Sequence, residues 1–273
     1  MTQIGRSVSN HTVVVPGRDD LAVTLSWAAR TDTGHRRAVN EDSFLARSPL
    51  FAVADGMGGH SAGDFASAAV VTRLAENVGH DYVEPGGIDR ALRAAVDDIG
   101  KGAGESELGT GTTVTGIALT LIGGTPQWVV FNIGDSRVYQ LVEGVLEQLT
   151  VDHSVVQELI DAGAIRPEDA EGHPHSNVIT RSVGFNDVPD PDFRVLPVIP
   201  GMRILICSDG LTKELTDYGI RHFLVSNPDP DDAADHLIDA ALDNGGRDNV
   251  TVVVVDVEAQ RPTVETRSAS PRH

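Results

Sequence analysis

The chain has 273 residues, 40% of them hydrophobic and 22% charged, which suffices for a sizeable core in one large domain or two small ones. Its 40 acidic and 21 basic residues give a formal net charge of −19, which opposes binding to nucleic acid or to an anionic membrane surface. Acids gathered in one cleft could instead hold divalent cations, but composition alone does not distinguish such a cleft from an acidic surface.

The number of cysteines and the length of the apolar runs indicate in which cellular compartment the protein is expected. Cys207 is the only cysteine, which excludes an internal disulfide and a cysteine zinc cage and suits a reducing cytoplasm. No signal-peptide-sized apolar run occurs in residues 1–20, and the run at 250–255 is too short to cross a bilayer. We therefore expect a soluble, cytoplasmic protein, unless the chain was cut from a longer membrane protein. The lack of a heptad pattern or long apolar stripe favours a monomer.

Residues 1–20 mix polar residues and glycine without period and are interpreted as a loose tail, as are residues 258–273. One domain over residues 21–257 is the simplest organisation. Within its first half we expect strands and helices in this order: strand 21–29, strand 51–54, helix 62–78 and helix 88–99.

The second half changes character. Short turns join four apolar runs at 112–122, 128–133, 137–142 and 145–149, and short turns favour antiparallel hairpins. There follow a helix at 155–162, a strand at 203–207, a helix at 231–242 and a strand at 250–255. This order predicts an α+β fold in which helices cover antiparallel sheets. Residues 163–200 contain six prolines and are expected to form a surface flap or long loop.

Aspartates stand at the ends of several apolar runs. Asp55, Asp135 and Asp209 follow such runs, and Asp248 precedes the last one. A fifth acidic spot is Asn40-Glu41-Asp42. Any one of these residues alone is best explained as a cap or turn former. If the sheets bring them together, however, their mutual repulsion would require cations.

Oxygen-only ligands favour Mg²⁺ or Mn²⁺ over zinc, and the neighbouring glycines would allow a carbonyl ligand. Two such ions can activate a shared water for attack on phosphorus, so no nucleophilic side chain is needed. The chain shows no convincing nucleophile. Arg37 is the best candidate for holding a phosphate, because its guanidinium fork matches two phosphate oxygens; the alternative is an exposed basic pair with Arg36.

Seven segments, in this order, resemble the type 2C (metal-dependent, PPM) serine/threonine protein phosphatases in their bacterial form. They are GHRRAVNEDS (34–43), VADGMGGH (53–60), GTT (111–113), GDSR (134–137), DHS (152–154), CSDGL (207–211) and GRDNVT (246–251). Any one is weak, but seven in register cover nearly the whole domain.

The resemblance implies an αββα sandwich of two antiparallel sheets flanked by helices, and two or three Mn²⁺ or Mg²⁺ ions per chain. It implies that Asp55 bridges two metals, that Asp209 and Asp248 complete the first site, and that Arg37 binds the substrate phosphate. The Gly56 carbonyl and Glu41, the latter through water, would serve the second site. Asp135 would join Asp209 in holding a third metal.

One position departs from many eukaryotic members of the family, which have His directly after the bridging Asp-Gly as a proposed general acid. Here that residue is Met57. His60 could substitute, although a loop histidine is more often a surface or hydrogen-bonding residue. His153 is interpreted as structural beside the flap, with a substrate-facing position as the alternative.

The leading function is hydrolysis of phosphoserine and phosphothreonine in proteins by a metal-bridging water, with phosphoproteins as partners, among them serine/threonine kinases or their targets. It would reverse kinase signalling. A non-catalytic phosphoprotein-binding regulator would typically have lost a metal aspartate, and none is missing. A metabolite phosphatase is not excluded by the metal residues; comparing phosphopeptides with sugar phosphates would decide.

Overall fold

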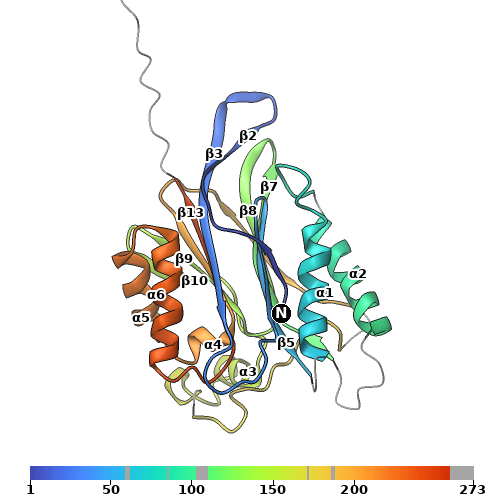
Figure 1. Ribbon diagram of the computed structural model, residues 1–273, viewed down its shortest axis with the longest axis vertical. Helices are drawn as coiled ribbons and strands as arrows, with labels where there is room; N and C mark the ends of the chain where they lie inside the picture. The colour runs from blue at the N-terminus through green and yellow to red at the C-terminus, as the bar shows by residue number, and fades with distance from the viewer. Residues whose placement is uncertain (59–61, 85, 103–109, 171, 186–187, 259–273) are drawn as a thin grey trace, which may run out of the picture.

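Two β-sheets lie face to face in the computed structural model, which describes residues 1–58, 62–84, 86–102, 110–170, 172–185 and 188–258 (Figure 1). The first sheet has the order β1 (Gln3–Gly5), β4 (Asp42–Arg47), β5 (Leu50–Met57), β7 (Val114–Ile122), β8 (Thr125–Ile133) and β11 (Asp192–Pro197), with β6 (Gly111–Thr112) pairing to β5. The second has the order β10 (Val145–Gln148), β9 (Arg137–Val142), β12 (Arg203–Cys207), β13 (Val250–Val257), β3 (Arg18–Asp32) and β2 (Val8–Val15).

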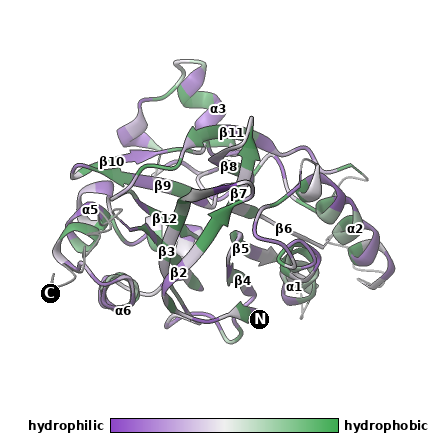
Figure 2. Ribbon diagram, turned by 90° about the horizontal axis from the view of Figure 1, so that it is seen from above, coloured by the Kyte–Doolittle hydropathy of each residue, from purple (hydrophilic) through white to green (hydrophobic). Residues whose placement is uncertain are grey.

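Helices cover the outer face of each sheet. The helices α1 (Ala62–Ala75) and α2 (Gly87–Gly102) pack on the first sheet, and α5 (Asp217–Ser226) and α6 (Pro230–Asp243) on the second (Figure 2). The α+β sandwich predicted from the sequence is confirmed. One detail differs, because β1 runs parallel to β4 while the other pairings are antiparallel. No helix in the described segments has the length and apolar character needed to span a bilayer.

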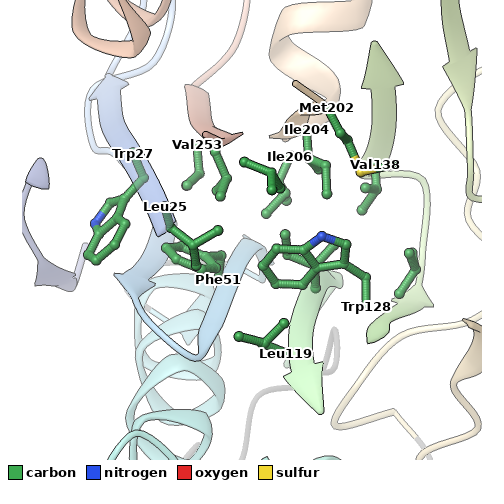
Figure 3. Packing of buried hydrophobic residues seen from close by; sticks show 14 of the residues in the cluster. Leu25, Trp27, Phe51, Leu119, Trp128, Val138, Met202, Ile204, Ile206 and Val253 are labelled. Carbon is green, nitrogen blue, oxygen red and sulfur yellow. The ribbon is translucent and has the colours of Figure 1, made fainter. Parts of the chain in front are cut away.

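The core between the sheets is apolar and partly aromatic. Trp27 from the second sheet contacts Phe51 edge-to-face, and Phe51 in turn contacts Trp128 of its own sheet (Figure 3). Both tryptophans are core residues, with 3% and 0% of their surface exposed. Strand β13 is buried almost throughout, because it lies inside its sheet and both of its faces are covered.

The expectation of a loose tail over residues 1–20 is wrong. Strand β1 pairs with β4, and β2 pairs with the long β3, so the N-terminal residues extend both sheets. The indole N–H of Trp27 donates to the carbonyls of Arg6 and Ala46 and links these strands. These edge strands are polar and mostly exposed, so they lack the apolar alternation that a sequence pattern would reveal. Residues 259–273, most of the predicted C-terminal tail, lie outside the described residues.

The proline-rich region 163–200 is less irregular than expected. Strand β11 at its end pairs with β8 over six positions, and a 3₁₀ turn covers Pro167–Asp169. Burial does not alternate along β11, because β11 is an edge strand with only one buried residue, Leu196. Helix α5 also has no counterpart among the predicted elements. The helix α3 (Val155–Asp161) agrees with the expected one.

Candidate functional site

The predicted acidic residues meet at one end of the two sheets. Asp55 lies near the end of β5, and Asp209 opens the short helix α4 (Asp209–Thr212) directly after β12. Asp135 lies in the turn between β8 and β9, and Asp248 immediately precedes β13. With Glu41 these residues line a cleft of about 830 Å³. The strand-end pattern in the sequence therefore reflects a real cluster.

Close backbone packing fixes the strand ends. A Cβ on Gly56 would lie 2.2 Å from the carbonyl oxygen of Gly63, so only glycine fits between β5 and the start of α1. A Cβ on Gly210 would lie 1.9 Å from the carbonyl oxygen of Asn249. These two glycines allow the backbones beside Asp55 and Asp209 to approach their neighbours. The predicted role of glycine in bringing the backbone close is confirmed in this geometric sense.

The carboxylates destabilise one another's charged forms. Burial is the main cause that raises the pKa of Asp55 well above its usual value, and repulsion from Asp42 and Asp209 adds to it. Burial, followed by repulsion from Asp209, raises the pKa of Asp135 to about 7. Nearby positive charge, such as a bound cation, would favour the ionised forms of these carboxylates.

Asp42 belongs to this cluster, although the sequence analysis assigned a role only to its neighbour Glu41. It stands opposite Asp55 in the β4–β5 register and is fully buried. Its Oδ2 accepts hydrogen bonds from Ser208 (2.9 Å) and Thr251 (2.6 Å), and burial raises its pKa to about 7. No local signal in the sequence identifies it, because an acid two residues before the apolar run 44–46 could equally lie in a loop.

Two cationic side chains form ion pairs with carboxylates of the cluster. The Lys213 ammonium lies 2.5 Å from Asp209 Oδ2 and 3.2 Å from Asp248 Oδ2. Arg37 approaches Asp248 with two nitrogens, Nε at 2.7 Å from Oδ1 and Nη2 at 2.9 Å from Oδ2. Burial works against the charge on Lys213, but Asp209 and Asp248 outweigh it and raise its pKa. Lys213 had no role in the sequence analysis.

The donor set fits hard divalent cations, although the side chains are not arranged as a finished coordination shell. Among the described residues, no three carboxylate, imidazole or thiolate groups converge as ligands of one ion. Instead, Oδ1 of Asp209 and Oδ1 of Asp42 are buried without a hydrogen-bond partner. Buried anionic oxygens without partners are costly, and a cation would satisfy them. Oxygen donors of this kind suit Mg²⁺ or Mn²⁺.

Asn249 holds the loop that carries Glu41 and Arg37 against β13. Its Oδ1 accepts from the Glu41 backbone N–H (2.8 Å), and its Nδ2 donates to the carbonyls of Thr33 and Val39. The amide of Asn249 therefore positions the loop beside Asp248 within the GRDNVT segment. This explains physically why a side chain with both a donor and an acceptor follows Asp248.

The predicted flap forms one wall of the cleft. Ser154 caps α3 by accepting from the Gln157 N–H and bridges to Ile179, and residues between them line the cleft, among them Pro167 and Ser176. His153 is 6% exposed and does not line the cleft. Its Nδ1 accepts from the Gly134 N–H, so its Nε2 carries the proton toward Asp192 Oδ2 at 3.2 Å. The structural interpretation of His153 is thus the one that the contacts favour.

Three further residues were considered for the chemistry of the cleft, and the structure describes two of them. Met57 lines the cleft beside Gly56. His60, the candidate general acid, lies outside the described residues. Cys207 is fully buried, and burial raises the pKa of its thiol to about 12, which agrees with the prediction that it is no nucleophile.

Replacing Lys213 with Gln is expected to tighten Mn²⁺ binding about tenfold, equivalent to about 1.4 kcal/mol. The ammonium competes for oxygens of Asp209 and Asp248, and the neutral amide competes less. Calorimetric titration of the metal-free protein would measure the change. The chain has one other lysine, the exposed Lys101, so Lys101→Gln is the matched control. Equal affinity in all three proteins would show that Lys213 does not compete.

Comparison with known proteins places this cleft in a known context. The family model described as Protein phosphatase 2C matches residues 20–238. The serine/threonine protein phosphatase PstP of Mycobacterium tuberculosis is 43% identical over 247 residues, which are 87% of this chain and 46% of PstP. The chain thus spans about half the length of PstP. The serine/threonine phosphatase stp of Listeria monocytogenes is 37% identical over 240 residues, which are 83% of this chain and 94% of that protein.

Solved structures agree. The crystal structure of M. tuberculosis PstP superposes with a TM-score of 0.77 at 40% identity, covering 86% of this chain and 99% of that one. The catalytic domain of PstP in complex with two manganese ions gives a TM-score of 0.76 at 39% identity, with coverages of 86% and 99%. The neighbouring fold is therefore one that holds manganese in at least one solved case.

Proposed function

Because the chain belongs to the protein phosphatase 2C family, we propose that it is a metal-dependent phosphatase that hydrolyses phosphoserine and phosphothreonine in proteins. The observation that carries the proposal is that the carboxylates of Glu41, Asp55, Asp135, Asp209 and Asp248 line one cleft with the Arg37 guanidinium. The family predicted from the seven motifs is thereby confirmed.

The proposed roles follow the geometry. Asp55, Asp209 and Asp248 would hold the metals, with Gly56 offering its carbonyl and Glu41 acting through water. Asp135 lines the same cleft as Asp209 and is the candidate for a third ion, so two or three Mn²⁺ or Mg²⁺ ions per chain remain our proposal. Bound divalent cations supply Lewis-acid stabilisation of the phosphoryl group and an activated water nucleophile.

Arg37 would bind the substrate phosphate. It is 53% exposed and lines the cleft, where its guanidinium contacts Asp248. Its fork can hold two phosphate oxygens, which would orient the phosphorus above Asp55. Because metal would compete with Arg37 and Lys213 for Asp248, loading the cleft would leave both cations available to the substrate.

Asp42 would hold the metal-binding residues in position without contacting the substrate. Its hydrogen bonds from Ser208 and Thr251 tie the start of β4 to the strand ends that carry Asp209 and Asp248. A residue that fixes the ligands in this way is a positioning residue, not a catalytic one.

The finer statements about biology are proposals as well. Partners are proposed to be phosphoproteins, among them serine/threonine kinases or their substrates, with the chain acting as a monomer in signal transduction. The single buried cysteine suits a cytoplasmic location. The domain responsible is proposed to extend over the two sheets, including the N-terminal strands.

Hydrolysis of a phosphothreonine peptide with Mn²⁺ tests the proposal. Release of phosphate should require the metal and stop with EDTA, and sugar phosphates should be poorer substrates. Turnover of sugar phosphates in preference to the peptide would favour a metabolite phosphatase. Tight peptide binding without turnover in folded, metal-loaded protein would favour a phosphoprotein-binding regulator.

A further inference from the structure

A second cavity of about 540 Å³ lies away from the metal cleft, and nothing in the proposed function uses it. Its walls come from the N-terminal strands β1 and β2, the β4–β5 turn and the segment after α1, around Trp27. In the β4–β5 register, Asp42 pairs with Asp55 at the metal end and Arg47 with Leu50 at the other. Five strand positions separate the two ends, about 17 Å at about 3.4 Å per residue. The two cavities are therefore distinct.

The lining of this cavity is basic in a strongly acidic chain. Four of its side chains are Arg6, His11, Arg47 and His80, against one acid, Asp81. Counting arginine and lysine against aspartate and glutamate in both cases, the cavity lining has two basic groups against one acid, whereas the chain as a whole has 21 against 40. Such a local field attracts anions.

The two arginines lack counter-charges. Neither Arg6 nor Arg47 forms an ion pair with any residue that the structure describes, whereas Arg30, Arg73 and Arg203 are each paired with carboxylates. Both are exposed and both line the cavity. Two such guanidiniums at one cavity can together hold an anion with several oxygens, and phosphate matches their forks best.

The floor of the cavity is rigid and partly apolar. The Trp27 indole is 3% exposed and is fixed by its two hydrogen bonds to the carbonyls of Arg6 and Ala46. The His11 ring contacts it edge-to-face at 5.5 Å between centroids. The volume is within the range of about 300–1,000 Å³ typical of small-molecule sites. A floor of this kind suits the organic part of a ligand whose phosphate meets the arginines.

From these observations we infer that the cavity around Trp27 binds a phosphate-bearing small molecule of about mononucleotide size, held by Arg6 and Arg47. The site is independent of the metal cleft and of the proposed phosphatase activity. It exists only because residues 3–15 form strands in place of a loose tail.

Nuclear magnetic resonance of the full chain, ¹⁵N-labelled and loaded with Mg²⁺, tests this directly. The chain has two tryptophans, so two indole N–H signals report on this cavity (Trp27) and on the core beyond Phe51 (Trp128, which does not line the cavity), with Trp27→Phe giving the assignment. The probe is the methylenephosphonate analogue of AMP, whose C–P bond resists hydrolysis, with adenosine and inorganic phosphate as partial ligands. We expect a saturable shift of the Trp27 signal while the Trp128 signal stays in place.

The matched variants are Arg6→Ala with Arg47→Ala, and Arg93→Ala, which removes an exposed arginine from α2. The double variant should bind the probe about 100-fold more weakly, at about tenfold for each charge-assisted contact, and Arg93→Ala should bind normally. Unchanged indole positions without probe show that the variant is folded; if it is not, the single exposed change Arg47→Gln replaces it.

Three results would overturn the inference. They are a Trp27 signal that does not respond to the probe, equal affinity in the double variant, and equal affinity for adenosine without its phosphate. A response to inorganic phosphate alone would keep the arginine site but remove the organic part of the ligand from the proposal.

Discussion

Asp55→Asn is expected to lower turnover of a phosphothreonine peptide roughly 1,000-fold. Metal-derived charge stabilisation contributes several kcal/mol to such reactions, and each 1.36 kcal/mol is about tenfold in rate. Asp55 is the residue whose charge interacts with the carboxylates on every side of the cleft, among them Asp209 and Asp248. Losing it should weaken metal binding as well as catalysis, and steady-state kinetics over a range of Mn²⁺ concentrations would measure both.

The same substitution should stabilise the metal-free fold, and this separates loss of function from misfolding. Folding the metal-free protein either buries the Asp55 charge among like charges or makes the carboxylate take up a proton, and a neutral amide avoids both costs. The melting temperature of the metal-free variant should rise, at about 2–4 °C per kcal/mol for a chain of this size. Asp239→Asn, an exposed position on α6, is the control and should change neither property. Full activity in Asp55→Asn would falsify the metal assignment.

Metal removal is expected to have the second large effect, one that depends on pH. The raised pKa values of Asp42 and Asp135, both about 7, lie above the usual value of 3.8 for aspartic acid. The folded metal-free protein therefore binds more protons than the unfolded chain between these values. The contribution of these two carboxyl groups to the free energy of unfolding is fully present below about pH 4. It is lost as the pH rises through about 7.

Bound cations reverse this trend, because they interact favourably with the ionised carboxylates that the metal-free protein disfavours. The rise in melting temperature on adding Mn²⁺ should be small near pH 5 and grow toward pH 8. Thermal unfolding with Mn²⁺ and with EDTA, at several pH values, would measure it. A metal-induced shift that stays constant over this range would contradict the proposal that these carboxylates meet the cation. In Asp55→Asn the shift should be small at every pH.

Much of the site could be predicted from the amino-acid sequence, because its residues end or begin apolar runs. Asp55, Asp135, Asp209 and Asp248 sit at such boundaries, and strand ends on one side of a sandwich meet in space. The seven motifs identified the family.

Other features left no local signal. Lys213 is a lone lysine just after α4, and only the fold places its ammonium between Asp209 and Asp248. Asp42 resembles a loop acid until the β4–β5 register sets it opposite Asp55. The edge strands β1, β2 and β11 expose most of their residues, so apolar alternation could not reveal them.

The sequence by itself determined the family, the α+β sandwich and the acidic residues of the cleft, because hydrophobic periodicity and motif spacing are local properties of the chain. The tertiary structure decided which charges face one another and how the N-terminal residues are used. Those outcomes depend on contacts between residues far apart in the chain, such as Trp27 with the carbonyl of Ala46 and Asp42 with Thr251. Backbone pairing at sheet edges and long-range electrostatics have no period that a single sequence displays.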